Sequence, residues 1–224
     1  YFVERTYAIF TSQDLLHWEL LQKFDLPGDD ECPDLYPLTA DDGRTLWVYS
    51  GAHDMYFVGD FDENGLYQPI QSVGQLSYNS QSYAAQTYYY EPGKPVIRFA
   101  WNRSDIPGAP FNGSMCTPTE MTLKKHGDRY YLSALPIKST ENLVVKSDKL
   151  DDFTLAHCTH ELGSKTCRIS FTVKEGDLTC SLYGLEMKLD KNGLTCGESI
   201  LPRLKNEPMK VDIITDTNSV ELSL

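Results

Sequence analysis

Short apolar or aromatic runs, separated by turn signals, dominate the first half of this sequence. Runs of strand length include TYAIFTS, TLWVYSG, MYFVGDF, YAAQTYYY and KPVIRFAW, and the turn signals DDG, ENG, EPG and SDIPG interrupt or follow them. Runs rich in β-branched and aromatic residues, bounded by Gly, Pro, Asn and Asp, are typical of strands and hairpins. No window of helical length keeps the apolar period of about 3.6 residues that a helix requires. The pattern predicts an all-β chain, with strands grouped as in a propeller blade or a sandwich.

The amino-acid composition of the sequence changes near residue 125. Beyond it the aromatic density falls, lysines become more frequent, and alternating segments such as CRISFTV, EMKLD and SVELSL are separated by small turns such as KEGD and KNG. We predict two units: a partial β-propeller over residues 1–125 and a β-sandwich over residues 126–224. The join KKHGDR is short and polar, which favours two units that pack together.

Both ends of the chain consist of strand-like material. The chain starts with YFVERTYAIF, without a methionine, and stops with the alternating residues NSVELSL. We therefore expect an internal piece of a longer protein, with a sandwich that is truncated at its C-terminus. Incomplete blades would leave backbone N–H and C=O groups unpaired at their edges, so we also expect self-association through these edges.

Composition limits the partners of the chain. Its 224 residues are 41% hydrophobic, which is enough to bury a sizeable core. A formal net charge of -12 repels phosphate backbones and anionic lipid, so we expect no nucleic acid or membrane partner and favour a neutral ligand. No stretch approaches the roughly 20 apolar residues of a membrane-spanning helix, and the chain contains no signal peptide, so cytoplasmic and secreted locations both stay open.

The cysteines form no C-x-x-C pair and specify neither a disulfide framework nor a metal template. An even count permits disulfides, but free thiols are favoured, and we expect no metal and no cofactor. No histidine lies near Cys32 in the sequence, so we expect a free, mostly buried thiol that packs beside the neighbouring acid and is not a nucleophile. The cysteines are Cys32, Cys116, Cys158, Cys167, Cys180 and Cys196.

The segment ECPDLYPL, residues 31–38, places a glutamate where a loop meets a strand. Glu31 follows the loop LPGDD and precedes the apolar residues of a predicted strand. A carboxyl group at such a position, close to aromatic residues, is partly desolvated, which raises its pKa and lets it act as a general acid. Taken alone, however, a glutamate at a strand start is usually a solvated surface residue.

Further motifs accompany ECPD in a particular order. AIFTSQDLLHWELL precedes it, and LWVYSG, YFVGDFDENGLYQPI, SYAAQTYYY, the Trp of FAWNR and FNGSMCTPTEMTL follow. In order and spacing the series resembles glycoside hydrolase family 32, the family of invertases, inulinases, levanases and other β-fructosidases. The resemblance extends from residue 1 to about residue 140 and is weaker beyond, where strands resemble those of the family's C-terminal sandwich.

The resemblance implies the last part of a five-bladed β-propeller followed by a β-sandwich, with a funnel at the propeller axis that binds a fructosyl unit. It also implies a retaining mechanism, in which Glu31 is the general acid/base and an aspartate nucleophile lies about 5 Å away. By their place in the motifs, Tyr83, Gln86, Trp101 and Asp34 are implied to bind substrate. Ordinary strand packing explains Tyr83, Gln86 and Trp101 equally well, because aromatic residues serve cores as readily as sugar stacking.

Two motifs of the family are absent from this chain. The NDPNG-type motif, which carries the nucleophile, and the Arg-Asp-Pro motif do not occur, so these residues by themselves are not expected to hydrolyse fructosides. Inside the matched region, LSYNSQSYAAQT lacks an aspartate that is usual in the family. Thr119 stands where an arginine is common, and Phe111 stands where a tryptophan is common. These departures affect the sugar subsite or the packing beneath it.

Three functions are compatible with the sequence. The first is a part of a β-fructosidase that acts on sucrose, sucrose phosphate, inulin or levan through Glu31. The second is a non-catalytic relative that binds or senses fructans. The third is a scaffold propeller of another class, in which ECPD is only the start of a strand.

Overall fold

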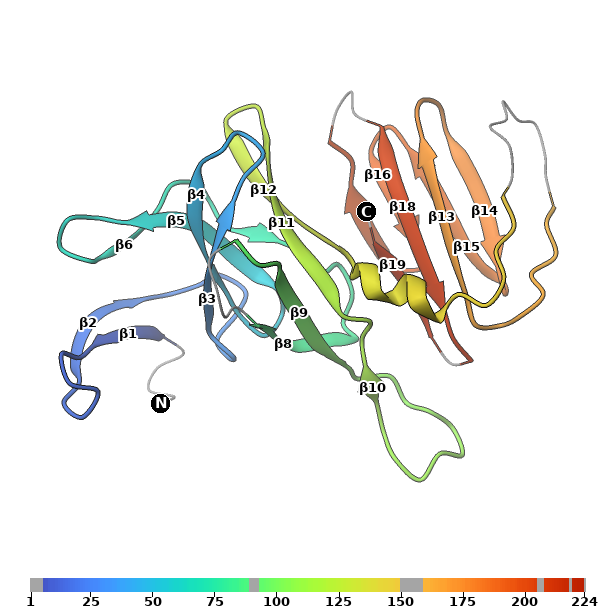
Figure 1. The fold of residues 1–224 in the computed structure, drawn as a ribbon. Coiled ribbons are helices and arrows are strands. Elements are labelled where there is room, and N and C mark those ends of the chain that lie inside the picture. Colours follow the sequence, from blue (N-terminus) through green and yellow to red (C-terminus); the bar gives the residue numbers. More distant parts are fainter. Residues whose placement is uncertain (1–5, 89–92, 150–158, 205–207, 218, 224) are drawn as a thin grey trace.

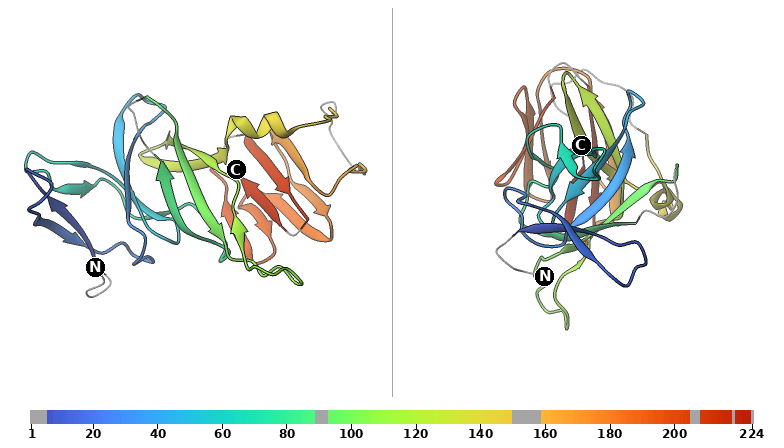
Figure 2. Two further views of the ribbon diagram at one scale, coloured as in Figure 1. Left: turned by 60° about the horizontal axis from the view of Figure 1, so that its bottom comes forward. Right: turned by 90° about the vertical axis from the view of Figure 1, so that its left-hand side faces the viewer.

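The computed structural model describes residues 6–88, 93–149, 159–204, 208–217 and 219–223. In these ranges the regular structure consists of β-strands and a single short 3₁₀ helix, η1 (Lys138–Leu143), so the prediction of an all-β chain is confirmed. A hairpin, two larger sheets and a sandwich follow one another along the molecule (Figure 1 and Figure 2). The chain passes through these layers in sequence order, from the N-terminal hairpin to the C-terminal sandwich.

The N-terminal hairpin consists of β1 (Tyr7–Thr11) and β2 (Glu19–Phe24), which pair antiparallel. The Asp14 carboxylate in its turn accepts two backbone N–H groups, as aspartates commonly do in turns. One face of the hairpin packs on the following sheet through aromatic rings. The Phe24 and Tyr49 rings, for example, meet edge to face with their centroids 4.6 Å apart.

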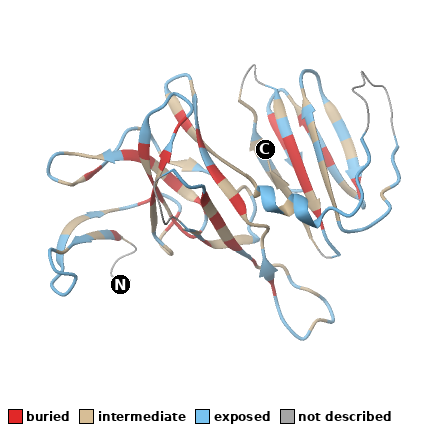
Figure 3. Ribbon diagram, viewed as in Figure 1, coloured by how far each residue is buried: buried red, intermediate tan, exposed pale blue. Residues whose placement is uncertain are grey.

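Two five-stranded antiparallel sheets form the middle of the molecule, and their core lies between them (Figure 3). The apolar core includes Tyr36, Val48 and Val58 from the first sheet and Val96 and Met121 from the second. The first sheet contains β3 (Asp34–Thr39), β4 (Thr45–Ser50), β5 (Met55–Phe61), β6 (Tyr67–Pro69) and β7 (Gly74–Gln75). The second contains β8 (Ser82–Tyr88), β9 (Val96–Asn102), β10 (Ser114–Met115), β11 (Thr119–His126) and β12 (Arg129–Pro136).

The second sheet crosses the boundary that the sequence predicted at residue 125. Strands β11 and β12 form one hairpin, whose register runs from Thr119 opposite Pro136 to His126 opposite Arg129. The predicted boundary therefore falls inside a pair of hydrogen-bonded strands. We infer that the first unit extends to Pro136, because a division within this hairpin would separate two strands of the same sheet.

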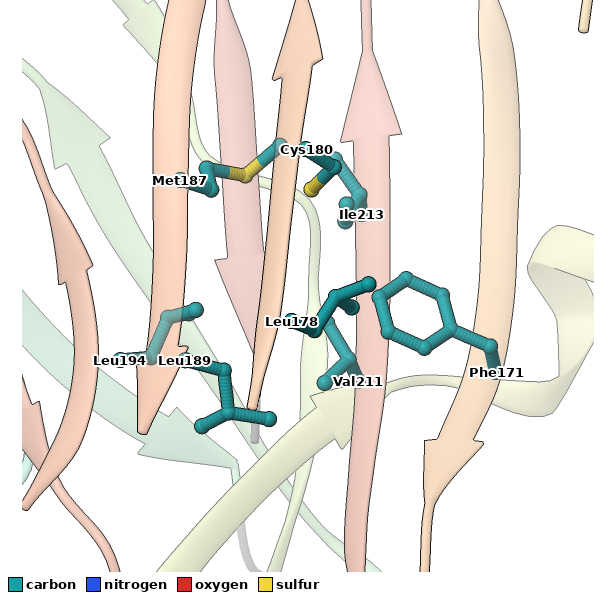
Figure 4. Close-up of a pocket in the computed structure, with 8 residues that line it drawn as sticks. All are labelled: Phe171, Leu178, Cys180, Met187, Leu189, Leu194, Val211 and Ile213. Atoms are coloured by element: carbon teal, nitrogen blue, oxygen red, sulfur yellow. The ribbon is translucent and has the colours of Figure 1, made fainter. Parts of the chain in front are cut away.

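The second unit is built from two facing antiparallel sheets. Their inner faces are apolar and meet in a single core, so the space between them is a packed interior and not a ligand site (Figure 4). One sheet has the strand order β13 (Cys167–Val173), β18 (Met209–Thr215) and β19 (Val220–Ser223). The other contains β14 (Leu178–Leu182), β15 (Leu185–Asp190), β16 (Gly193–Cys196) and β17 (Ser199–Pro202). Core residues include Phe171, Leu178, Cys180, Met187, Leu189, Leu194, Val211 and Ile213.

Direct hydrogen bonds join the two units. The backbone N–H and the hydroxyl of Thr117 donate to the Glu221 carboxylate at 2.8 and 3.1 Å. The units therefore touch through side chains at the end of the second sheet, as the short polar join between them led us to expect.

Candidate active site

Glu31 lies in the loop that leads from the N-terminal hairpin into β3. Two donors hold its backbone: the N–H of Ala52 and the phenol of Tyr7 bond to the Glu31 carbonyl oxygen at 2.9 and 2.8 Å. Ala52 belongs to the loop between β4 and β5, and Tyr7 belongs to β1. The loop that carries the acid is therefore fixed from two neighbouring elements.

The phenol of Tyr83 donates a hydrogen bond to Oε2 of Glu31. This bond is the main cause that raises the pKa of Tyr83 to about 12, because an ionised phenol would lose the bond and face the charge of the carboxylate. At neutral pH Tyr83 therefore keeps its proton and orients the carboxyl group of Glu31. The sequence motifs singled out both residues, and the structure brings them into contact.

A β-bulge in β8 aims Tyr83 at Glu31. The pairing of β8 with β9 shifts register between Tyr83 and Gln86, and Ala84 in the bulge has a φ of 52°. The N–H of Ala84 bonds to the carbonyl oxygen of Ala52 at 2.9 Å, which ties the bulge to the same loop that holds Glu31. A positive φ is uncommon for residues other than glycine, and bulges often re-aim side chains beside functional sites.

Arg103 and Trp101 surround the Tyr83 ring. The guanidinium carbon of Arg103 lies 4.1 Å from the ring centroid, and the Trp101 ring lies 6.5 Å away in a tilted orientation. The Trp101 side chain is 41% exposed, and Gly113 lies so close that a Cβ there would overlap its indole nitrogen. The site thus presents a carboxyl group, a phenol and an open indole face, groups that can hydrogen-bond and stack on a sugar.

Asp34 and Gln86, the other two predicted substrate-binding residues, join β8 to β3 and to the loop before it. The Asp34 carboxylate accepts the backbone N–H of Thr87 at 2.6 Å, and burial raises its pKa. The Gln86 amide donates to the carbonyl oxygen of Cys32 at 3.0 Å, while its side chain stays exposed. Both side chains thus hold the strands beside the acid, and their contact with substrate stays a prediction.

Cys32 is a free thiol that is partly exposed, so it is less buried than the sequence led us to expect. Burial raises the pKa of this thiol, and the charges of Glu31 and Asp29 raise it further. The thiol therefore stays protonated at neutral pH and is a poor nucleophile, as predicted. The other four described cysteines are free as well, and Cys158 lies outside the described residues.

A buried ion pair joins Arg98 of β9 to Asp54 in the loop between β4 and β5. Arg98 donates from Nε to Asp54 at 2.9 Å and from Nη2 to the Ser82 hydroxyl at 2.8 Å. Ser82 belongs to the segment in which the sequence departs from the family, and here its hydroxyl serves the ion pair. Thr119, another departure, is buried, and its hydroxyl lacks a partner among the described residues. Phe111, the third, is 62% exposed.

Asp29 and His53 also border Tyr83 and Glu31, although no sequence motif pointed to them. The Asp29 carboxylate accepts the backbone N–H of His53 at 2.6 Å and lies 3.1 Å from Nδ1 of the same residue. The His53 ring meets the Tyr83 ring edge to face, with centroids 4.8 Å apart. The only sequence feature that could have pointed to His53 is a histidine in the short loop GAHDM, and nothing in the sequence connects this loop with Glu31.

In the described ranges, no three His, Cys, Asp or Glu side chains gather closely enough to hold a metal ion. Nor does any helix there combine the length and apolar character that crossing a membrane requires.

Comparison with known proteins identifies the family of the chain. The model of the glycosyl hydrolases family 32 N-terminal domain matches residues 3–134, more than half of the sequence. The chain belongs to this family. This match confirms the family that the order of the sequence motifs indicated. The chain is therefore related to β-fructosidase-type glycoside hydrolases.

Individual relatives agree with this assignment. Over 162 residues the chain is 28% identical to a fructan beta-fructosidase of Streptococcus mutans, covering 60% of this chain and 11% of that protein. Over 220 residues it is 25% identical to a levanase of Bacillus subtilis, covering 84% of this chain and 32% of the levanase. This family 32 chain therefore spans less than half the length of these two proteins.

The fold is that of the family's solved structures. The exo-inulinase of Aspergillus awamori superposes with a TM-score of 0.68 and 19% identity over 97% of this chain and 54% of the inulinase. A β-fructofuranosidase of Bombyx mori superposes with a TM-score of 0.61 and 18% identity over 98% of this chain and 53% of its own. The predicted fold class, part of a five-bladed β-propeller followed by a β-sandwich, is confirmed.

Proposed function

We propose that this family 32 chain carries the general acid/base of a retaining β-fructosidase, and that Glu31 is this residue. One observation carries the proposal: the Glu31 carboxyl group is held by the Tyr83 phenol beside the exposed Trp101, within the part of the chain that matches the family model. The substrate is a sucrose-type or polymeric β-fructoside. Relatives named for levan, inulin and fructan support this class.

In the proposed reaction the Glu31 carboxyl group protonates the glycosidic oxygen while the bond from that oxygen to the fructosyl anomeric carbon breaks. An aspartate outside this chain attacks the anomeric carbon and forms a covalent fructosyl intermediate. The Glu31 carboxylate then takes a proton from water, whose oxygen attacks the same carbon while the bond from that carbon to the aspartate breaks, and fructose is released. Tyr83 keeps the carboxyl group oriented in both steps, and Trp101 offers an apolar face to the sugar.

Glu31→Gln in the full-length protein tests the proposal. The amide keeps the shape and can still accept the Tyr83 hydrogen bond, so folding and binding should change little. Because general acid catalysis typically contributes about 10²–10⁴-fold, kcat on sucrose should fall by this order. An aryl fructoside, whose leaving group needs no proton, should lose far less in the glycosylation step.

Glu63→Gln is the matched control, because Glu63 is an exposed glutamate in the turn before β6. It should leave both rates near the wild-type value. If Glu31→Gln also leaves sucrose hydrolysis near the wild-type rate, Glu31 is not the acid and ECPD is only the start of a strand. A wild-type full-length protein that binds fructans without hydrolysing them would instead favour the non-catalytic alternative.

A further inference from the structure

The loop between β4 and β5 places His53 at the rim of the candidate site. The proposed mechanism assigns no role to this residue. His53 is 46% exposed through its side chain, whereas the Asp29 side chain beside it is fully buried. The loop that carries it also holds Glu31, through the hydrogen bond from Ala52 N–H to the Glu31 carbonyl oxygen. His53 and the acid are therefore parts of one connected structure.

Asp29 clamps His53 at two points. One carboxylate oxygen accepts the backbone N–H of His53 at 2.6 Å, and the other lies 3.1 Å from ring atom Nδ1. Contacts to both the main chain and the ring of one residue leave the side chain little rotational freedom. Gly51 makes room for this clamp, because a Cβ at that position would lie 2.5 Å from the Asp29 carboxyl carbon. The ring orientation is thus built into the fold.

The clamp also determines which ring nitrogen carries the hydrogen. A carboxylate only accepts hydrogen bonds, so the neutral ring donates from Nδ1–H to Asp29 and keeps a lone pair on Nε2. No described residue forms a hydrogen bond with Nε2. The partly exposed ring thus offers a fixed acceptor on the side away from Asp29.

The position of the His53 ring indicates which part of the substrate Nε2 would contact. The His53 and Tyr83 rings are in edge-to-face contact at 4.8 Å, and the Tyr83 hydroxyl is bonded to Glu31. An acid that protonates the glycosidic oxygen must lie next to the leaving group, so groups that border the acid also border the leaving group. Leaving groups in sucrose and fructans are sugars, whose hydroxyls are donors that Nε2 can accept.

We propose that His53 binds the leaving-group sugar of the β-fructoside through Nε2, with its ring held by Asp29. The inference rests on the proposed function, since it needs Glu31 as the acid. It makes His53 a specificity-determining residue, which favours leaving groups with hydroxyls over those without them. Tyr83 orients the acid, and His53 contacts the sugar on the leaving-group side of the bond that breaks.

The test compares sucrose with an aryl fructoside in the full-length protein. His53→Ala removes both the clamp and the acceptor, whereas His53→Asn keeps an amide N–H near the position of Nδ1 but lacks Nε2. Both variants should lower kcat/KM on sucrose by about 2- to 10-fold, mainly through KM, and leave the aryl fructoside nearly unchanged. His17→Ala is the matched control, because Asp14 holds exposed His17 in the same way far from the site in sequence.

Nitrogen NMR of the His53 ring in the full-length protein supplies a second measurement that needs no activity. At a pH where the ring is neutral, the wild-type ring should be the Nδ1–H tautomer, and Asp29→Asn should shift the population toward Nε2–H. A wild-type ring in the Nε2–H form overturns the proposal. So do unchanged ratios of sucrose to aryl fructoside hydrolysis in the His53 variants of an active enzyme. A wild-type protein that hydrolyses neither substrate overturns the proposed function and this inference together.

Discussion

Replacing Asp54 by alanine should destabilise the first unit more than other single changes near the site. Asp54 and Arg98 form an ion pair whose side chains are only 4% and 8% exposed. In the Asp54→Ala variant, the guanidinium stays buried, and the Ser82 hydroxyl, at 2.8 Å, is its remaining hydrogen-bond partner among the described residues. A buried charge that loses its counter-charge typically destabilises a protein by about 3–5 kcal/mol.

A double variant that removes both charges should recover part of the lost stability. Asp54→Leu combined with Arg98→Met removes both charges and fills the space with apolar groups of similar length. Exchange of a buried ion pair for apolar side chains is often neutral in its effect on stability, so we expect at least half of the lost stability to return. The Ser82 hydroxyl then loses its partner, which leaves a smaller deficit of about 1 kcal/mol.

Urea denaturation followed by tryptophan fluorescence measures these effects. Trp18, Trp47 and Trp101 are the three tryptophans of the sequence, and all lie in the first unit, so the signal reports on that unit. Asp105→Ala, at an exposed aspartate, is the control and should change stability by less than about 0.5 kcal/mol. A loss below about 1 kcal/mol for Asp54→Ala, or a double variant as unstable as the single one, would refute the reasoning.

Two further predictions concern buried polar groups. Thr119→Val removes a buried hydroxyl without a partner among the described residues, and the urea midpoint should rise by an amount equivalent to about 1 kcal/mol; a lower midpoint contradicts this. Burial alone would raise the pKa of Asp212, but hydrogen bonds from Arg168 and Ser170 and the charges of Arg168 and Lys210 lower it overall. The stability that Asp212 contributes is therefore present above its unfolded pKa of about 3.9 and lost as the pH falls through the lower folded value, so acid titration by circular dichroism should show a flatter curve for Asp212→Asn.

The sequence alone determined the fold class and the family. Strand-length runs bounded by Gly, Pro, Asn and Asp are local signals, and a hairpin such as β1–β2 forms between neighbours in the chain, so both can be recognised without tertiary information. Glu31 could be proposed as a candidate acid from the sequence, because its motif is contiguous and precedes a strand. The order of several motifs then identified the family that the comparison confirmed.

Only the tertiary structure decided which side chains meet. Tyr83 reaches Glu31 across 52 residues, and it does so from a bulge whose positive φ at Ala84 no sequence rule predicts. The alternation of a strand shows which residues share a face but not which distant strand or loop that face will contact. The clamp of Asp29 on His53 could not be predicted for this reason. The same holds for the pairing of β11 with β12 across residue 125, because both depend on how the layers of the molecule pack.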